Sequence, residues 1–322
     1  VRRAGIIVVR IRTTVFGYPK TRLRFGRSEE MMTIRKRLFG TALCLCALVC
    51  ILCVSASAES GHVHPVCGAE HQNIGDHTGE CGDLTWTEWD GTSAIPYGTN
   101  NTAYVYLADS VTLSSPLEVQ DGYTLYLCLN GHTITKTTGS DSFRGVVVVQ
   151  PNSQFTLCDC KTGGTITHKD GVTGRGVRVG SSDAFVPQAS FIMYGGSISG
   201  NKLDSQSGGG GVELHNASFR MYGGEISGNH AGNSDGGGVY AHDSSNIFLY
   251  GGTISGNTSN RAGGGISTVA STFEMHGGEI TGNTAAMDGG GAELWNASFT
   301  LSGGKISGNT ASNGNGGGVY FG

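Results

Sequence analysis

Apolar and polar side chains alternate within one phrase that occurs five times between positions 191 and 309 of the chain. Each copy is an alternating apolar stretch that leads into the letters Gly-Gly-x-Ile-[Ser/Thr]-Gly-Asn. The copies occupy residues 191–201, 219–229, 247–257, 273–283 and 299–309. Alternation with a period of two predicts a short strand that buries one face. A repeat at this interval predicts a solenoid, because one unit cannot bury its apolar face without neighbours.

Three apolar segments divide each repeat, and each segment predicts one short strand. The first carries a column of Phe or Ile followed by a column of Met or Leu, and the second carries an invariant Ile. The third follows Gly-Gly-Gly and begins at Val212, Val239, Ile266, Ala292 and Val319. Glycine makes up 55 of the 322 residues, which suits tight corners and disfavours the rival array of helices. The predicted fold is an all-β, right-handed parallel β-helix with about 26–28 residues per coil.

Weaker copies extend the same pattern toward the N-terminus. Residues 155–167 and 127–134 keep the apolar strand and the isoleucine, and residues 174–177 resemble the Gly-Gly-Gly-Val corner. We therefore expect the β-helix to cover residues 103–322, with about seven or eight coils. The asparagines that end the five phrases are expected to form a ladder of side-chain hydrogen bonds along the stack. This column consists of Asn201, Asn229, Asn257, Asn283 and Asn309.

The N-terminal stretch 1–58 differs in composition from the rest of the chain. A basic run, an apolar segment from Leu38 to Val54 and a small-x-small ending follow one another between positions 31 and 58. This order predicts a secretory signal over 31–58, cleaved between Ala58 and Glu59. A membrane anchor is the alternative, although the apolar segment is at the short limit for a span. Residues 1–30 are expected to be an upstream or non-native extension, and the β-helix is expected to be truncated at its C-terminus.

Removing the predicted signal changes the charge of the chain. The mature chain keeps 10 basic and 23 acidic side chains, a net charge of −13 against −4 for the whole chain. A surface this acidic repels phosphate backbones, so nucleic acid is not an expected partner. No apolar segment after position 58 is long enough to span a membrane. We therefore expect an exported chain, secreted or held at the cell surface, with cationic or neutral partners.

Histidine and cysteine gather in the segment 59–102, which precedes the predicted β-helix. Close together in this segment lie His62, His64, Cys67, His71, His77 and Cys81. Structural zinc needs four such ligands, so a structural zinc site is one of two open interpretations of the segment, although the spacing matches no standard zinc finger, and no other cofactor is predicted. The alternative is a disulfide between Cys67 and Cys81 with solvated histidines, which export permits. Three further cysteines remain without an assigned role, and the odd total of five leaves at least one thiol free or paired elsewhere. They are Cys128, Cys158 and Cys160.

Variable positions between the repeated phrases offer candidate chemistry on the outside of the coils. Exposed aromatic and imidazole side chains can anchor sugars, so one such set predicts a binding stripe. The stripe comprises His215, Tyr240, His242, Trp295 and Tyr320. Ordinary corner residues without a binding role are the alternative. No catalytic pair is predicted, because matching glutamates lie two or three coils apart, roughly 10–14 Å, beyond the roughly 5–9.5 Å of glycosidase pairs.

The two repeated phrases, Gly-Gly-Gly-[Val/Ile/Ala] and Ile-[Ser/Thr]-Gly-Asn, resemble the repeats of the chlamydial polymorphic outer membrane proteins. More broadly, the chain resembles the pectate-lyase-like right-handed β-helices of bacterial surface proteins. Residues 62–135, with Trp86 and Trp89, are similar to the entry segment of exported β-helix proteins from Gram-positive gut bacteria. The resemblance implies adhesion or surface display, whereas some relatives are polysaccharide lyases or hydrolases.

We therefore expect a non-enzymatic adhesin or display module of the cell surface, which contacts glycans or surface proteins. A polysaccharide lyase or glycoside hydrolase of the same fold is one alternative. A structural stalk for a missing C-terminal part is another, because solenoids also serve as extended spacers.

Overall fold

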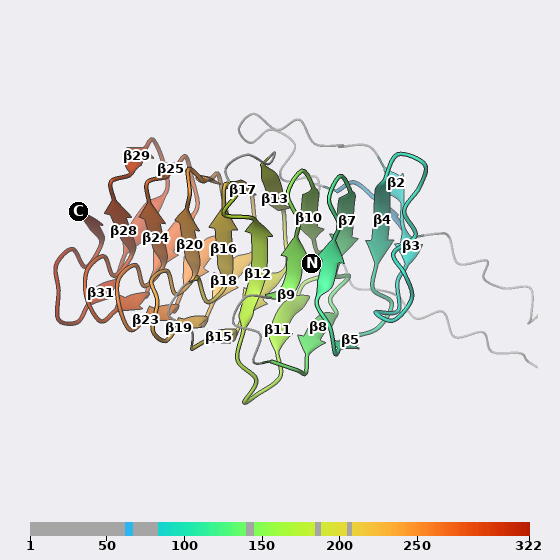
Figure 1. Ribbon diagram of the computed structural model, residues 1–322, viewed down its shortest axis with the longest axis horizontal. Coiled ribbons are helices and arrows are strands. Elements are labelled where there is room, and N and C mark those ends of the chain that lie inside the picture. The colour runs from blue at the N-terminus through green and yellow to red at the C-terminus, as the bar shows by residue number, and fades with distance from the viewer. Residues whose placement is uncertain (1–61, 67–82, 140–144, 184–187, 205–207) are drawn as a thin grey trace, which may run out of the picture. The chain divides into compact units, whose positions relative to one another are not determined.

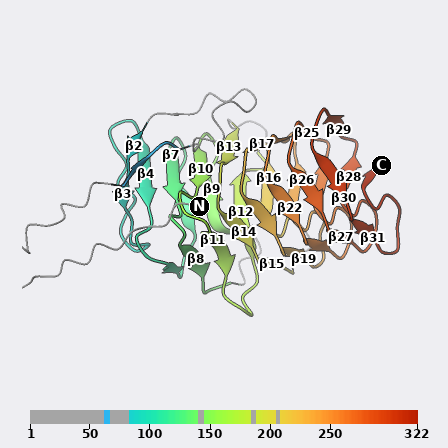
Figure 2. The ribbon, with the colours of Figure 1, turned by 180° about the vertical axis from the view of Figure 1, so that it is seen from behind.

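Most β-strands of the described residues run parallel and stack coil upon coil (Figures 1 and 2). The computed structural model describes residues 62–66, 83–139, 145–183, 188–204 and 208–322. Within these ranges every element of regular secondary structure is a β-strand. The predicted all-β, parallel β-helix architecture is therefore confirmed.

Four parallel sheets run along the stack. The Phe sheet contains β3 (Thr87–Glu88), β4 (Thr102–Tyr106), β7 (Thr124–Cys128), β10 (Gln154–Cys158), β13 (Ala189–Met193), β17 (Ala217–Met221), β21 (Asn246–Leu249), β25 (Thr272–Met275) and β29 (Ser298–Leu301). The Ile sheet contains β5 (Val111–Leu113), β8 (Thr133–Lys136), β11 (Thr165–His168), β14 (Ser197–Ser199), β18 (Glu225–Ser227), β22 (Thr253–Ser255), β26 (Glu279–Thr281) and β30 (Lys305–Ser307). The Val sheet contains β6 (Leu117–Val119), β9 (Gly145–Val149), β12 (Arg175–Gly180), β16 (Val212–His215), β20 (Val239–His242), β24 (Ile266–Val269), β28 (Ala292–Trp295) and β32 (Val319–Phe321). The corner sheet contains β15 (Lys202–Leu203), β19 (His230–Ala231), β23 (Thr258–Ser259), β27 (Thr284–Ala285) and β31 (Thr310–Ala311).

Equivalent residues of successive coils lie directly beside one another in these sheets. Phe191 pairs with Phe219 and Ile226 pairs with Ile254, so each inward position of the repeat forms a continuous column. The rings of Phe191 and Phe219 stack with their centroids 4.9 Å apart, and both are fully buried. Full burial of one such side chain contributes about 1.5–3 kcal/mol. The inward columns join into one apolar core, as the alternating pattern predicts.

The sequence predicts three strands per coil, and the structure adds a fourth in the later coils. The strands of the corner sheet begin directly after the asparagine of each repeated phrase. In this sheet Thr258 pairs with Thr284, and Ser259 pairs with Ala285. The prediction missed these strands because each is too short to display a period of two.

The predicted asparagine ladder is present, and its members up to Asn283 are fully buried. Nδ2 of Asn229 donates hydrogen bonds to Oδ1 of Asn257 at 3.0 Å and to the carbonyl oxygen of Ile198 at 2.9 Å. The backbone N–H of Asn229 also donates to Oδ1 of Asn257, at 3.0 Å. The same three bonds recur at Asn257 and Asn283. The ladder therefore pairs polar groups at a dry corner, where each unpaired group would cost about 1–3 kcal/mol.

Glycine is required at corners where the backbones of two coils approach closely. A Cβ atom on Gly238 would lie 2.6 Å from the carbonyl oxygen of Gly265 in the next coil. Gly224 has a φ of +85°, a conformation that favours glycine. The Gly-Gly-Gly and Gly-Gly phrases therefore allow adjacent coils to stack at sheet spacing.

The N-terminal end of the stack starts earlier than Ala103, where the sequence places it. Strand β3 pairs in parallel with β4, so residues 87–88 of the His- and Cys-rich segment already join the Phe sheet. A separate antiparallel pair is formed by β1 (Val63–His64) and β2 (Leu84–Thr85). Part of the segment 59–102 is thus integrated into the β-sheet structure.

Inward side chains of the last coil are less covered than those before it. Leu301 is 55% exposed, whereas Met275, its partner one coil earlier, is fully buried. Each coil of a solenoid buries the inward side chains of its neighbour, which explains this difference. Among the described residues no helix has the length and hydropathy to cross a bilayer. The predicted signal over 31–58 lies outside the described residues.

Replacing Asn257 with alanine is expected to destabilise the stack strongly. The change removes the acceptor of the Asn229 backbone N–H and of one Nδ2–H of Asn229, and it removes the donor that Asn257 offers to the carbonyl oxygen of Ile226. At about 1–3 kcal/mol for each unpaired group, the free energy of unfolding should fall by about 3–5 kcal/mol in a urea titration. Asn260→Ala, at an exposed position, is the matched control and should change it by less than about 0.5 kcal/mol. Equal effects of the two changes would contradict a stabilising ladder.

Candidate functional site

The outer face of the Val sheet holds a cluster of polar side chains that departs from the repeat. On β16, Glu213 and His215 alternate with core residues, which places them on the outer face of the sheet. Parallel register pairs His215 with His242 on β20. The same register places Glu213 between Arg178 on β12 and Tyr240 on β20. Polar residues from three successive coils therefore meet at one place.

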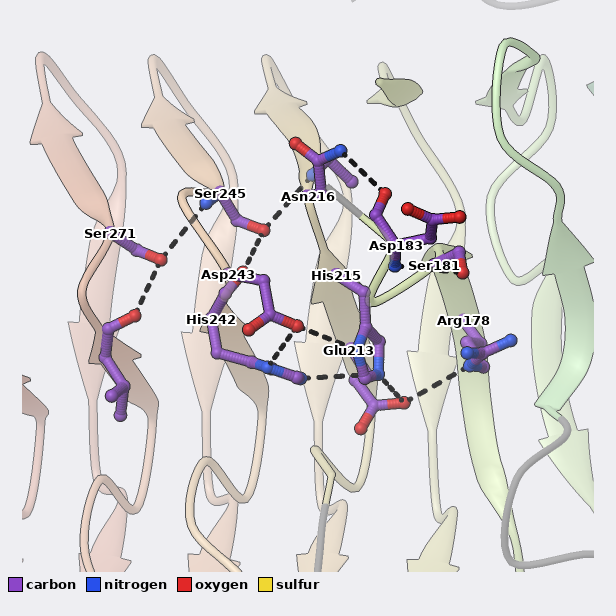
Figure 3. A network of polar contacts seen from close by, with 12 residues as sticks. Arg178, Ser181, Asp183, Glu213, His215, Asn216, His242, Asp243, Ser245 and Ser271 are labelled. Carbon is purple, nitrogen blue, oxygen red and sulfur yellow. Dashed lines mark hydrogen bonds and ion pairs between the residues drawn. The ribbon is translucent and has the colours of Figure 1, made fainter. Parts of the chain in front are cut away.

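We call Glu213, His215, His242 and Asp243 the histidine cluster (Figure 3). Nε2 of His215 lies 3.1 Å from Oε2 of Glu213 and 3.3 Å from Nε2 of His242. Oδ2 of Asp243 lies 3.0 Å from Nδ1 of His242 and 3.5 Å from Nδ1 of His215. The two imidazole rings meet edge to face, with centroids 3.9 Å apart. Two imidazoles are thus held between a buried carboxylate and a partly exposed one.

A turn with left-handed backbone brings Asp243 over the two rings. Asp243 and Ser244 have φ values of 56° and 60°, a region that aspartate tolerates better than most side chains. Oγ of Ser245 donates to the carbonyl oxygen of His242 at 2.5 Å and accepts from the backbone N–H of Ala217 at 3.2 Å (Figure 3). These bonds fix the turn after β20 and, with it, the position of the Asp243 carboxylate.

Both histidines of the cluster are neutral at neutral pH. Burial lowers the pKa of His215 to about 4, and Arg178 and Arg175 contribute to that lowering. Burial and the neighbouring His215 likewise lower the pKa of His242 to about 4. Nδ1 of His242 is the imidazole nitrogen closest to Asp243, so it donates its proton to that carboxylate. The two imidazoles therefore join the Asp243 carboxylate on one side and the Glu213 carboxylate on the other.

Glu213 forms a buried ion pair with Arg175. The two side chains are 1% and 2% exposed, respectively, and Nε of Arg178 lies 3.7 Å from the same carboxylate oxygen. By the register of β12 and β16, Arg175 stands at the level of Gly210, in the corner that later coils build from glycine. A guanidinium buried at this corner needs a carboxylate from the next coil, because an uncompensated buried charge is strongly unfavourable. The Glu213 carboxylate thus serves to neutralise the buried charge of Arg175.

Three ligand atoms of the histidine cluster are close enough to share a metal ion. Those of Glu213, His215 and His242 lie within 4.8 Å of one another. However, the guanidinium groups of Arg175 and Arg178 lie beside the same carboxylate, and they repel a further cation. The charge distribution therefore favours hydrogen bonding over metal binding at this cluster.

The predicted sugar-binding stripe is divided along the stack. Tyr240 stacks on His242 with ring centroids 4.9 Å apart, and His215 adjoins them. Trp295, which is 55% exposed, and Tyr320 lie on β28 and β32. Strand β24, which separates β20 from β28, carries no aromatic residue. The structure therefore joins three of the five predicted residues and places the other two on later coils.

The glutamates of the repeat occupy two different environments. Glu225 and Glu279 are exposed, as their positions at the start of β18 and β26 suggest. Glu293 is 6% exposed and accepts a hydrogen bond of 2.6 Å from Oγ of Ser267. Burial raises the pKa of Glu293, and the Ser267 hydroxyl opposes that rise. Glu293 is thus paired within the Val sheet.

The predicted zinc ligands are described only in part. Outside the described residues lie Cys67, His71, His77 and Cys81. The zinc set and the alternative Cys67–Cys81 disulfide therefore stay predictions. His62 and His64 are described, and their ligand atoms lie within 4.8 Å of the sulfur atoms of Cys128 and Cys160. Two of the predicted ligands thus lie close to Cys128 and Cys160, for which the sequence analysis predicts no role.

The sequence analysis does not predict Arg175 or Asp243 as site residues, although the sequence around each of them departs from the repeat. Arg175 interrupts a corner that is otherwise built of glycine, which marks a large polar side chain at a crowded place. Asp243 follows His242 where other repeats have Asn216 and Asn296, and all three have positive φ. An acidic residue at a turn position that holds Asn216, Ala270 and Asn296 in other coils indicates a specific partner for the carboxylate.

Replacing one partner of the buried ion pair is expected to lower the free energy of unfolding more than replacing both partners. Glu213→Gln leaves the Arg175 guanidinium buried without a counter-charge, so the free energy of unfolding should fall by about 3–5 kcal/mol. Combining this change with Arg175→Met removes the orphaned charge and should restore most of that loss. Urea titrations of both single variants and the double variant measure the coupling. Strictly additive losses would show that the two side chains do not compensate one another.

The two neutral histidines are expected to make stability depend on pH. The pKa of each is 6.5 in the reference state and about 4 in the folded chain. Between these values the unfolded chain binds more protons, so the free energy of unfolding falls as the pH falls from about 6.5 to about 4. Urea midpoints between pH 7 and pH 4 should show this fall, and the double variant His215→Gln, His242→Gln should show a shallower one. An unchanged slope in the double variant would assign the effect to other groups.

Comparison of the chain with protein-family models, with curated proteins and with solved structures finds no match. The coarse architecture, a parallel β-solenoid, therefore comes from the strand pairing described above. The role of the histidine cluster is likewise to be inferred from its own geometry, charge and exposure.

Proposed function

We propose that this chain is an exported β-helix protein of the cell surface that binds glycans without transforming them. The observation that carries the proposal is the histidine cluster with Tyr240 stacked at its edge, on the outside of a regular scaffold. The predicted secretory signal and the resemblance to bacterial surface β-helices support the location.

The side chains at this place suit the recognition of hydroxyl groups. Sugar binding combines an aromatic face with fixed polar groups that exchange hydrogen bonds with the ligand. Tyr240 and His242 provide adjacent ring faces, and Asp243, which is 39% exposed, provides an acceptor. Because Asp243 already accepts from His242, its carboxylate is held in position before a ligand arrives. A neutral imidazole pair beside a carboxylate favours an uncharged or cationic glycan over a phosphorylated one.

The scaffold supports binding rather than any particular reaction. The inward columns are occupied by the core, so the outward positions are the ones that vary from coil to coil. Residues of the histidine cluster are carried by β16 and β20 or follow them directly. Side chains on strands are positioned more accurately than side chains on long loops.

A carbohydrate-active enzyme of the same fold is the second candidate. The hydrogen bond from His242 to Asp243 favours it, because a histidine oriented by a carboxylate can act as a general base. A glycosidase also needs a second carboxyl group that exchanges a proton. Glu213, the other carboxylate of the cluster, is committed to the buried ion pair with Arg175. Binding without turnover therefore has the stronger support.

Binding and turnover are tested together on the full-length chain. A glycan and mucin array should give binding, and assays for reducing sugars and unsaturated products on polyuronides should give no product. Tyr240→Ala and His242→Ala should each weaken the binding at least tenfold, which corresponds to about 1.4 kcal/mol. His276→Ala, a histidine on the side of the Phe sheet, is the matched control and should bind like the unchanged chain.

Each contrary result has a distinct meaning. Product release would favour the enzyme over the binding module. Binding that survives both variants would place the binding surface elsewhere on the stack, and the lack of any binding would favour the stalk.

A further inference from the structure

We infer that His62, His64, Cys128 and Cys160 bind a structural zinc ion that fastens β1 to the first coils of the β-helix. We call these four residues the His–Cys group. Their four ligand atoms all lie within 4.8 Å of one another. The histidines flank Val63 on β1, whereas the cysteines come from β7 and from the turn after β10. The group joins side chains as far as 98 positions apart in the sequence.

The composition and spacing of the His–Cys group match tetrahedral zinc. Two thiolates and two imidazoles are one of the common ligand sets of structural zinc. Zn–S distances of about 2.3 Å and Zn–N distances of about 2.0 Å at a tetrahedral angle separate sulfur from nitrogen by about 3.5 Å. Sγ of Cys160 lies 3.5 Å from Nε2 of His62. On binding, each thiol releases its proton to solvent and ligates zinc as the thiolate, with no change of oxidation state.

His64 is oriented as a ligand by the groups around it. Its Nδ1 donates a hydrogen bond of 2.7 Å to the carbonyl oxygen of Pro65, which leaves the lone pair on Nε2. Metal-binding histidines commonly donate from their other nitrogen in this way. Nε2 of His64 is buried and forms no hydrogen bond of ordinary geometry, although it lies close to the sulfur of Cys160. A buried nitrogen of this kind calls for a partner, and a metal ion supplies one.

Aromatic packing holds both imidazoles against the β-helix. The His62 ring stacks on Tyr106 of β4 with centroids 4.1 Å apart. The His64 ring stacks on Trp86 at 4.6 Å, and Nε1 of Trp86 donates to the carbonyl oxygen of His64 at 3.0 Å. These contacts are independent of any metal, so the ligands are arranged before the ion binds. Preorganised ligands lose less conformational freedom on binding.

A disulfide between Cys128 and Cys160 is the competing outcome, because an exported protein meets oxidising conditions. It would leave Nε2 of His64 buried without a partner, whereas zinc pairs all four groups at once. Zinc also explains why the two histidines that flank Val63 have ligand atoms within 4.8 Å of the same two sulfur atoms. By closing a long loop, the ion would stabilise the N-terminal end of the stack.

The test is the zinc content of the full-length chain, purified with zinc present and then dialysed without a chelator. We expect about one zinc ion per chain by mass spectrometry of the metal. His62→Asn and Cys160→Ser should each reduce the retained zinc at least tenfold. Cys158→Ala is the matched control, because Cys158 pairs in register with Cys128 but does not belong to the His–Cys group. The Cys158→Ala variant should therefore retain its zinc. Substitution by Co²⁺ should give thiolate-to-metal charge-transfer absorption that Cys160→Ser weakens.

Three results would overturn the inference. One is a zinc-free chain, and another is a Cys128–Cys160 disulfide in peptides mapped without reduction. The third is zinc that survives both His62→Asn and Cys160→Ser, which would assign the ion to the ligands predicted between positions 67 and 81. His62 is only partly buried, so His62→Asn keeps the test valid if Cys160→Ser fails to fold.

Discussion

In-register stacking of one coil on the next, at the roughly 4.8 Å spacing of a β-sheet, is the constraint on which the rest of the structure depends. A side chain that fits an inward position of one coil meets the same side chain in the next, so apolar positions become columns. The asparagine column is the most demanding case. A buried amide finds partners for both its donor and its acceptor when the neighbouring coil offers another amide at the same level. This mutual dependence explains why the asparagine is present in all five copies, whereas the outward residues vary.

The polar column continues into coils where the asparagine itself is absent. His168 occupies the corresponding level before Asn201, and its Nδ1 lies 2.9 Å from Oδ1 of that residue. One coil earlier Lys136, which pairs with His168 in the Ile sheet, is 3% exposed and donates to the carbonyl oxygen of Thr138. Burial lowers the pKa of His168, and the charge of Lys136 adds to this lowering, so both favour the uncharged ring. The earlier, less regular coils thus also place a hydrogen-bonding side chain at this corner, a histidine or a lysine in place of the asparagine.

The fold was predictable from the sequence to the extent that it is built from repeated columns. The Phe, Ile and Asn columns recur at a nearly constant interval, so the sequence states which residues face the core and which lie beside one another. The histidine cluster is different, because Arg175 comes from a degenerate coil at an irregular spacing from Glu213. In the repeat, the residue equivalent to Glu213 is Glu293, three coils further along the chain, whereas the ion-pair partner of Glu213 lies one coil earlier. The same limit applies to Cys128 and Cys160, whose histidine neighbours precede the repeats altogether.

Electrostatics gives the two polar clusters opposite tendencies, although both contain a pair of histidines. In the histidine cluster the charge of Glu213 is already balanced by Arg175 and Arg178, so a metal ion would add uncompensated positive charge. What remains is a set of neutral rings and one oriented carboxylate, which suits hydroxyl groups. In the His–Cys group the two thiols become anions when a metal binds, and their charge then balances that of the ion. A metal cation is therefore favoured at the His–Cys group and disfavoured at the histidine cluster. The difference follows from what each stacked coil places beside the imidazoles: a guanidinium in one case and a thiol in the other.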